Sequence, residues 1–375
     1  MDTLTPTAIT AAYALIKPHI HRTPLLTNTT LSDLASSPQD LSPETSSSES
    51  TESRPAKPKI RLFFKCENLQ RIGAFKARGA FHAVKRLIDE MGNHAQALSL
   101  AATTFQIPAH IVMPSISTPS KISATQSYGG RVIFSGSTST EREAVVAQVQ
   151  AETGAILVPP YDHPDIILGQ GTVGLEMEEQ YRELVEQNPE SPIHGDRDRK
   201  ERRKARGFDA IITPVGGGGL NAGVATYFSD RPGTKVFGAE PSHEGADDCR
   251  RGLASGSRIT SVKSSTIADG LRTPVGVLNW AVISDPSKVS GVYSVSEEQI
   301  KAAMRLVLER MKVVVEPSAV VGLAVVLYNE EFRRMVEQEA GEEGWDVGVV
   351  FSGGNTSVEV IGRLFISDEH PLVHL

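Results

Sequence analysis

The stretch KCENLQRIGAFKARGA, residues 65–80, places Lys76 directly after an aromatic residue in a glycine-flanked turn, with a second cation, Arg78, two positions later. If the amine of Lys76 is semi-buried there, desolvation and the neighbouring cation lower its pKa and make it a nucleophile toward a carbonyl group. Most lysines are ordinary surface residues, so a reactive Lys76 needs the other parts of a site elsewhere in the chain.

Two further motifs could supply those parts. The loop PVGGGGLNAG, residues 214–223, follows an apolar strand pattern and opens a helix, so its glycines let backbone amides approach a phosphate. The strand pattern VGVVFSGGN, residues 347–355, ends at Ser352, whose hydroxyl could bond a heteroaromatic nitrogen. Each motif alone fits an ordinary packing turn equally well. A carbonyl cofactor with a phosphate handle would use Lys76 and the glycine loop together.

Short β-rich runs alternate with helical patterns along the chain, which predicts an α/β fold with largely parallel sheets. The helical pattern at the N-terminus has Thr5 as its N-cap and Pro6 as its first residue. The predicted strands are KIRLFFKCE (59–67), AHIVMP (109–114), RVIFSG (131–136), AILVPP (155–160), FDAIITPV (208–215), KVFGAEP (235–241), VVVEP (313–317) and VGVVFSG (347–353).

Composition and charge favour small-molecule chemistry. The formal net charge of −7 gives no overall attraction to nucleic acid or to an anionic membrane, and two cysteines are too few for a disulfide scaffold. Residues 36–58, rich in Ser, Pro and Glu, and residues 187–207, rich in Lys and Arg, are predicted to be flexible insertions. A polyanion-binding role for the basic run is the alternative to a solvated loop. A cytoplasmic, reducing location fits this composition.

The alternation breaks once. A helical pattern over residues 76–90 runs directly into another over residues 91–105, without the apolar strand expected between them.

Taken together, the motifs resemble those of the fold-type-II pyridoxal-phosphate enzymes, and among them the serine/threonine dehydratase and serine racemase family. Besides residues 65–80, the resemblance rests on GNHAQALSLAA (92–102), GQGTVGLEM (169–177), PVGGGGL (214–220), TIADGL (266–271), VEPSAVVGLA (315–324) and FSGGN (351–355). It implies a fold like that of the tryptophan synthase β-subunit, with two open, twisted, mainly parallel sheets. Residues 1–76 and 164–375 would form a large cofactor-binding domain, and residues 77–163 a small α/β domain.

The resemblance also assigns the cofactor site. Lys76 would hold pyridoxal 5'-phosphate as a Schiff base and act as the base at the substrate Cα, with Phe75 beside the ring. Asn93 would bind the ring hydroxyl, and Ser352 the pyridine nitrogen. A serine there, instead of a carboxylate, would favour elimination over transamination. The phosphate would lie on Gly216, Gly217, Gly218 and Gly219.

Two accessory sites are implied by the same resemblance. Glu240, Asp248 and the carbonyl of Ala246 would bind Mg²⁺ or Ca²⁺, with Asp247 as a competing ligand and a solvated acidic loop as the alternative. An ATP effector, bound at a subunit interface as in some relatives, would contact Gln96, Tyr128, Asp209, Lys312 and Asn355.

The break at Glu90 and Met91 then acquires a meaning. Relatives have a strand and a pair of small hydroxyl residues immediately before GNH, so about a dozen residues are absent here. Met91 cannot replace the serine that acts as acid or base in racemases. A gene model that lost coding sequence, a short isoform and a non-catalytic binder are the competing explanations.

The expected function is therefore a homodimeric L-serine/L-threonine ammonia-lyase, or dehydratase, that releases ammonia and pyruvate or 2-oxobutanoate and is similar to serine racemase. A catalytically impaired pyridoxal-phosphate-binding paralogue and a β-replacement enzyme of the same fold are the alternatives. No nucleic acid or membrane partner is expected.

Overall fold

The structure is a computed structural model that describes residues 3–39, 54–88, 96–117, 119–136, 139–187 and 207–366. Its main element is a six-stranded sheet with the order β1-β2-β8-β5-β6-β7. The strands are β1 (Leu25–Thr27), β2 (Ile60–Cys66), β5 (Ala210–Pro214), β6 (Lys235–Pro241), β7 (Gly291–Val295) and β8 (Trp345–Phe351). Only β1 runs antiparallel to its neighbour.

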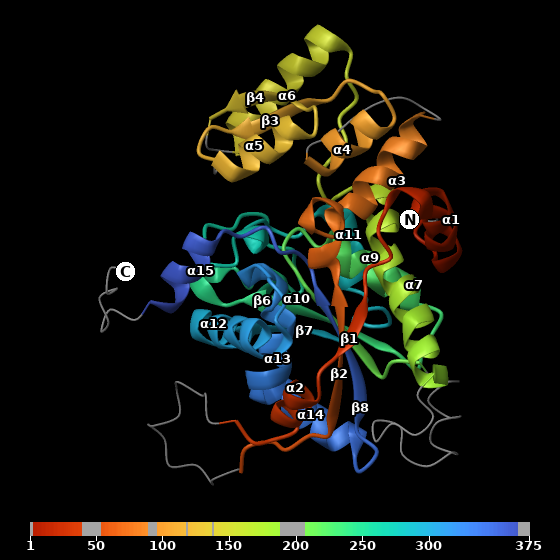
Figure 1. The fold of residues 1–375 in the computed structure, drawn as a ribbon, viewed down its shortest axis with the longest axis vertical. Helices are drawn as coiled ribbons and strands as arrows, with labels where there is room; N and C mark the ends of the chain where they lie inside the picture. The colour runs from red at the N-terminus through yellow and green to blue at the C-terminus, as the bar shows by residue number, and fades with distance from the viewer. Residues whose placement is uncertain are drawn as a thin grey trace.

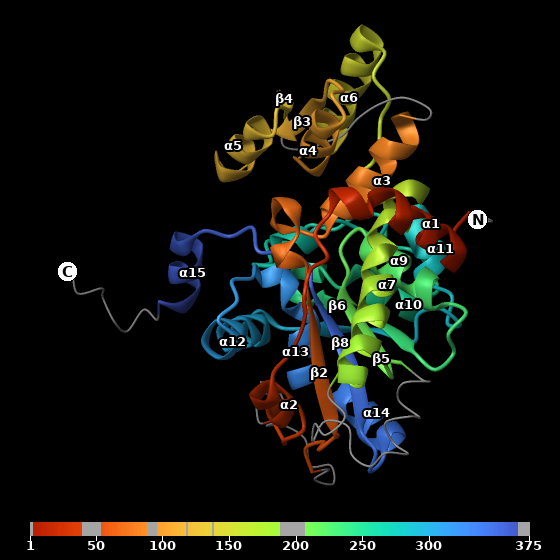
Figure 2. The ribbon, with the colours of Figure 1, turned by 45° about the vertical axis from the view of Figure 1, so that its right-hand side comes forward.

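Helices cover both faces of this sheet, and Figures 1 and 2 show it at the centre of the larger part of the molecule. Successive strand residues join opposite cores, as Phe63 and Phe64 do in β2. Burial on both faces requires near-continuous apolar strands, which is the pattern of β5 and β8. One core includes residues of α1 (Pro6–Ile16), α3 (Lys76–Ile88), α7 (Pro164–Gln187) and α9 (Gly219–Phe228); the other includes α2 (Thr29–Ala35), α12 (Glu297–Leu306), α13 (Val321–Tyr328) and α14 (Glu330–Ala340).

Helix α7 lies in backbone contact with both α3 and α9, through glycines. A Cβ atom on Gly169 would lie 2.5 Å from the carbonyl oxygen of Arg78, and one on Gly171 would lie 2.7 Å from that of Gly223. Real Cβ atoms do not approach backbone so closely, so the glycines of the GQGTVG motif let the three helices approach. This contact fixes α3 and α9 relative to each other.

A second, two-stranded parallel sheet pairs β3 (His110–Pro114) with β4 (Arg131–Ser135). Figure 1 shows it at one end of the molecule with α4 (Gln96–Thr104), α5 (Pro119–Ser127) and α6 (Ser139–Thr153). We propose 77–163 as the bounds of this small domain and residues 1–76 and 164–375 as the large one.

Six of the eight predicted strands are confirmed. The prediction of strands at 155–160 and 313–317 is wrong, because neither segment forms a strand or joins a sheet in the part of the chain that the structure describes. Strands β1 and β7 were missed: β1 has three residues, and β7 begins with glycine and lies at a sheet edge, so neither shows a clear apolar period. The N-terminal helix is confirmed, with the side chain of Thr5 accepting from Ala8 N at 3.1 Å.

The predicted break lies between α3 and α4, at residues outside those that the structure describes. Helix α3 ends at Ile88 and the next element is helix α4, which begins at Gln96. Glu90, Met91 and Asn93 lie outside the described residues, as do positions 40–53 and 188–206 of the two predicted insertions.

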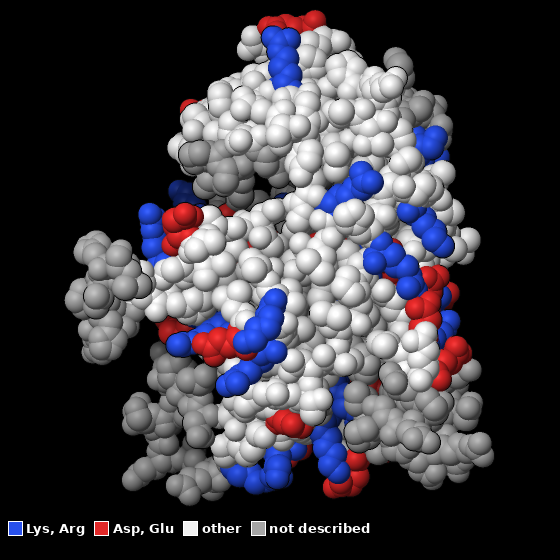
Figure 3. All heavy atoms as spheres, in the orientation of Figure 1, with Lys and Arg blue, Asp and Glu red and all other residues white. Residues whose placement is uncertain are grey.

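On the face shown in Figure 3, acidic and basic side chains lie beside one another over the larger part of the molecule. Among the described residues, none of the helices combines the length and the apolar character that crossing a membrane requires.

The remaining α-helices in the described ranges are α10 (Asp248–Ser255), α11 (Val277–Ile283) and α15 (Val358–Phe365).

Candidate active site

The turn that carries Lys76 is bonded to the turn that carries Ser352. Phe75 N donates to the carbonyl oxygen of Ser352 at 3.0 Å, and Gly354 N donates to that of Gly73 at 2.9 Å. Between these bonds Ala74 and Gly353 form an antiparallel bridge. Because β2 and β8 are parallel neighbours, both turns lie at the carboxyl edge of the sheet, where open α/β sheets place ligands. The structure thus brings together two motifs that are far apart in the sequence.

Lys76 itself differs from the expectation in one respect. Its side chain is exposed, so the semi-buried amine assumed from the sequence is not found, although Phe75 beside it is half-buried. Lys76 is the first residue of α3, and Arg78, two positions later, is fully buried. The charge of Arg78 is engaged by the carboxylates of Glu67 and Glu176.

The glycine loop connects β5 to α9. Gly218 is the N-cap of α9 with φ +91°, a left-handed conformation that favours glycine, and no side chain caps the helix. A Cβ atom on Gly217 would lie 2.3 Å from the ring of Tyr161. The first amides of a helix have no partners within it, so an uncapped N-terminus without side chains fits a phosphate group. The residues present therefore fit the phosphate of the expected cofactor.

Other segments brace this loop, and the sequence did not indicate two of the residues involved. The carbonyl oxygen of Gly217 accepts from Gly276 N at 3.0 Å and from Asn279 Nδ2 at 2.7 Å. The same Nδ2 donates to the carbonyl oxygen of Tyr161 at 3.1 Å. A Cβ atom on Gly216 would lie 3.0 Å from the carbonyl oxygen of Gly270, so the TIADGL motif packs on the loop. Tyr161 and Asn279 stand in no glycine motif, so no local pattern marked them.

Glu240 and Asp248 are buried near each other. The Glu240 carboxylate accepts from the amides of Cys249 at 3.0 Å and Arg250 at 2.9 Å, in the first turn of α10. Burial, and then the charge of Asp248, raise the pKa of Glu240 well above its usual value. Burial raises the pKa of Asp248 to about 6, and its Oδ1 atom is buried without a hydrogen-bond partner among the described residues.

The arrangement of these two carboxylates fits a bound cation, because a cation would remove their mutual repulsion and bind the unpartnered oxygen of Asp248. Asp247, the competing ligand, is paired with Arg251 at 2.8 Å, which favours Asp248. No group of three His, Cys, Asp or Glu side chains gathers at a metal-binding distance in the described ranges, so the buried Ala246 would have to supply its carbonyl oxygen.

The positions expected to contact ATP do not meet within one chain. Asp209 precedes β5 and bonds Asp346 at the start of β8, whereas Asn355 follows the end of β8. The length of β8 separates them by about 20 Å at 3.3 Å per residue. Tyr128 lies between α5 and β4, and Lys312 Nζ donates to the carbonyl oxygen of Glu309. The ATP site, with Gln96 at the start of α4, stays a prediction that requires a second subunit.

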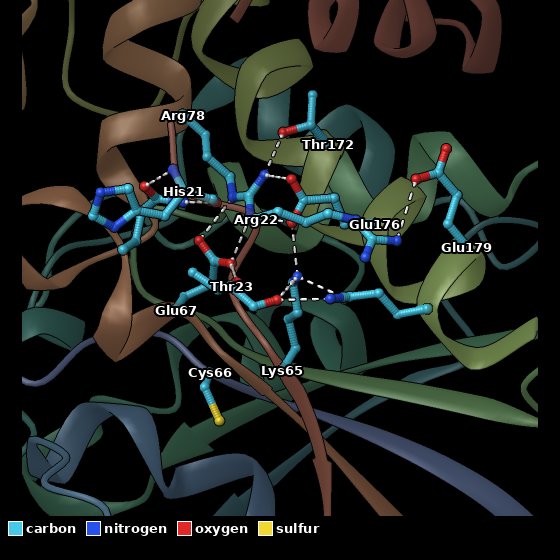
Figure 4. Close-up of polar contacts among 12 residues, drawn as sticks. His21, Arg22, Thr23, Lys65, Cys66, Glu67, Arg78, Thr172, Glu176 and Glu179 are labelled. Carbon is cyan, nitrogen blue, oxygen red and sulfur yellow. Dashed lines mark hydrogen bonds and ion pairs between the residues drawn. The ribbon is translucent and has the colours of Figure 1, made fainter. Parts of the chain in front are cut away.

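A buried ion network beneath the Lys76 turn was also missed. It joins Lys65, Glu67, Arg78 and Glu176, shown in Figure 4. The first three stand inside residues 65–80, but charged residues are usually exposed, and their common partner Glu176 is distant in the sequence.

Comparisons with known proteins agree with this geometry. The family model of pyridoxal-phosphate dependent enzymes matches residues 49–353. The chain is 38% identical to a serine racemase of Arabidopsis thaliana over 96% of each chain, and 35% identical to an L-threo-3-hydroxyaspartate ammonia-lyase of Saccharomyces cerevisiae over 94% of each. The structure of maize serine racemase matches with a TM-score of 0.76 at 36% identity, covering 96% of each chain. The chain belongs to the pyridoxal-phosphate dependent enzymes, in the fold-type-II family of serine racemases and hydroxy amino acid dehydratases.

Proposed function

We propose that this chain binds pyridoxal 5'-phosphate at Lys76 and is built for ammonia-lyase chemistry on L-serine and L-threonine. The observation that carries the proposal is the bonding of the Lys76 turn to the Ser352 turn at the carboxyl edge of the sheet. The uncapped glycine loop at the start of α9 supports it. The products would be ammonia and pyruvate or 2-oxobutanoate.

Each residue has a defined task in this proposal. The amine of Lys76 would hold the cofactor and, once the substrate amine displaces it, accept the proton from Cα. The amides of residues 216–219 would hold the phosphate, Asn93 the ring hydroxyl, and the hydroxyl of Ser352 the ring nitrogen. Phe75 would lie against the ring. Pyridoxal phosphate supplies the electron sink that makes loss of the Cα proton feasible.

Accessory features complete the proposal. Glu240, Asp248 and the carbonyl of Ala246 would bind Mg²⁺ or Ca²⁺, and the protein would be a cytoplasmic homodimer. Racemisation is not proposed for this chain, since Met91 stands where a hydroxyl residue would be needed.

A second candidate is a chain with impaired turnover because it lacks a strand. The alignment with the Arabidopsis relative runs over 373 positions but includes only 96% of the 375 residues, about 360, so about 13 of the relative's residues face a gap. This number supports the estimate of about a dozen residues missing before Gly92. A truncated gene model and a binder without turnover are both compatible with it.

The test is to load the purified protein with pyridoxal phosphate and supply L-serine, L-threonine or L-threo-3-hydroxyaspartate. We expect yellow protein and release of a keto acid. Yellow protein without keto acid would favour the impaired candidate. Colourless protein after loading would contradict the cofactor assignment itself.

A further inference from the structure

Glu176, on α7, holds two cations that come from different parts of the fold. Its Oε2 atom accepts from Lys65 Nζ at 2.7 Å and from Arg78 at 2.7 Å, and its Oε1 atom accepts from Arg78 at 3.0 Å. Lys65 belongs to β2, and Arg78 to the first turn of α3. Figure 4 shows the two cations converging on this carboxylate. Glu176 therefore ties β2 and α3 to α7.

All N–H groups of the two cations in the network are used, and its formal charges balance. Arg78 also donates to both carboxylate oxygens of Glu67, at 2.7 and 2.8 Å, and to Thr172 Oγ1 at 3.3 Å, which uses all five of its N–H groups. Lys65 donates to the carbonyl oxygen of Thr23 at 2.7 Å and to Gln180 at 2.8 Å, which uses its remaining N–H groups. The side chains of the four ionic members are at most 1% exposed. Two cations and two carboxylates balance, so the loss of one leaves a buried charge unpaired.

The network acts on the first turn of α3, where Lys76 begins. Arg78 N donates to the carbonyl oxygen of Phe75 at 3.0 Å, and Phe75 N donates to that of Ser352. The backbone at Lys76 is thus held by the Ser352 turn on its N-terminal side and by the guanidinium of Arg78 on its C-terminal side. Because Gly169 and Gly171 place α7 against α3 and α9, the same helix spans the distance between Lys76 and the phosphate loop.

We propose that Glu176 is a positioning residue: through Arg78 it sets where the amine of Lys76 stands relative to the phosphate loop at residues 216–219. This inference rests on the proposed role of Lys76. The side chain of Glu176 is 1% exposed and its carboxylate already accepts from Lys65 and Arg78, so its partners are side chains of the network and not a ligand.

The test compares Glu176→Gln with a matched control on the same helix. Glu178→Gln removes a carboxylate whose side chain is 8% exposed. In the natural chain this carboxylate bonds Tyr227 at 2.7 Å and Arg231 at 3.1 Å, and neither residue belongs to α3. Both variants are loaded with pyridoxal phosphate at a temperature at which circular dichroism shows them folded. The readouts are cofactor affinity, the pH dependence of the cofactor's absorption, and the fraction of Lys76 labelled after borohydride reduction.

We expect Glu176→Gln to weaken cofactor affinity by about tenfold or more, because a small displacement of a reacting group has effects of at least this size. The pH dependence of the cofactor's absorption should shift as well. Glu178→Gln should retain both properties at a similar loss of Tm. The double variant Lys65→Met/Glu176→Gln, which restores the charge balance, should recover part of the affinity, and it serves as the test if Glu176→Gln fails to fold.

The outcomes separate this inference from the proposed function. If the natural chain does not take up the cofactor, the role of Lys76 fails. If the natural chain takes it up and Glu176→Gln loses stability but keeps the affinity, pH profile and labelling of the natural chain, Glu176 is only structural and the inference is overturned.

Discussion

The two sheets of this protein differ in how completely they are covered. Every residue of β8 and of β5 is buried, and helices pack on both faces of the six-stranded sheet. In β4 only Ser135 is buried, and Phe134 is 51% exposed. Ile156 and Leu157, predicted to lie in a strand of the same domain, are 41% and 42% exposed.

The difference separates two requirements of the chemistry. The six-stranded sheet and its helices carry the Lys76 turn, the Ser352 turn and the phosphate loop, so attachment of the cofactor depends on the well-packed region. The two-stranded sheet is too small to be stable by itself, and its domain exposes apolar residues such as Phe134, Ile156 and Leu157. Turnover depends on both regions, so in this chain attachment is the firmer expectation.

The largest predicted effect concerns the well-packed region. Lys76→Ala removes the amine that would hold the cofactor and take the Cα proton, so keto acid release should fall by about 10²–10⁴-fold. The yellow absorption of the lysine linkage should vanish as well. Absorption spectra and a coupled keto acid assay measure both; a yellow, active Lys76→Ala protein would place the site elsewhere.

Breaking the ion network should lower the free energy of unfolding of the well-packed region. Glu67→Gln leaves the guanidinium of Arg78 with one carboxylate instead of two in a fully buried position. Removing one member of a buried pair destabilises by about 3–5 kcal/mol. Chemical denaturation measures this loss. Glu309→Gln, which removes an exposed ion pair with Arg305, is the control and should leave the denaturation midpoint almost unchanged.

A cation should stabilise the carboxylate pair at Glu240 and Asp248. At a hundredfold excess over its Kd, Mg²⁺ or Ca²⁺ adds about 2.7 kcal/mol, and a chelator removes it. The gain should be larger at pH 8 than at pH 5, because the pKa of Asp248 is about 6 and the cation binds its ionised form. Thermal unfolding with and without cation measures it, and an equal gain in Asp248→Asn would place the cation elsewhere.

The smallest predicted effect comes from an insertion that would make the coverage of the two-stranded sheet more like that of the six-stranded sheet. Inserting the Arabidopsis relative's residues between Glu90 and Met91 should cover Ile156 and Leu157 and add about 1 kcal/mol, since each is partly exposed now. Amide exchange in β3 should slow, and keto acid release should rise. An insertion of the same length composed of Gly and Ser is the control; equal effects from both would mean that no strand position exists.

The sequence predicts the well-packed six-stranded sheet better than it predicts the small domain with the two-stranded sheet. Strands β5 and β8 are continuous apolar runs because both faces are buried, so their pattern identified them and the turns at their ends. The segment at 155–160 has the composition of a strand but pairs with no strand among the described residues, and composition alone does not reveal whether a pairing partner exists. Arg78 was read as a cation beside an amine, although the structure turns it inward to Glu176. The direction of a side chain at a helix start depends on tertiary partners, and one sequence does not show them.

Identifying the lysine that holds the cofactor tests the central claim most directly. The unaltered chain is incubated with pyridoxal phosphate, reduced with borohydride, digested and analysed by mass spectrometry. The account predicts the phosphopyridoxyl mass on the peptide that contains Lys76, whether or not the preparation releases keto acid. Labelling of another lysine, or of none, would contradict the claim that Lys76, carried by the well-packed region, holds the cofactor.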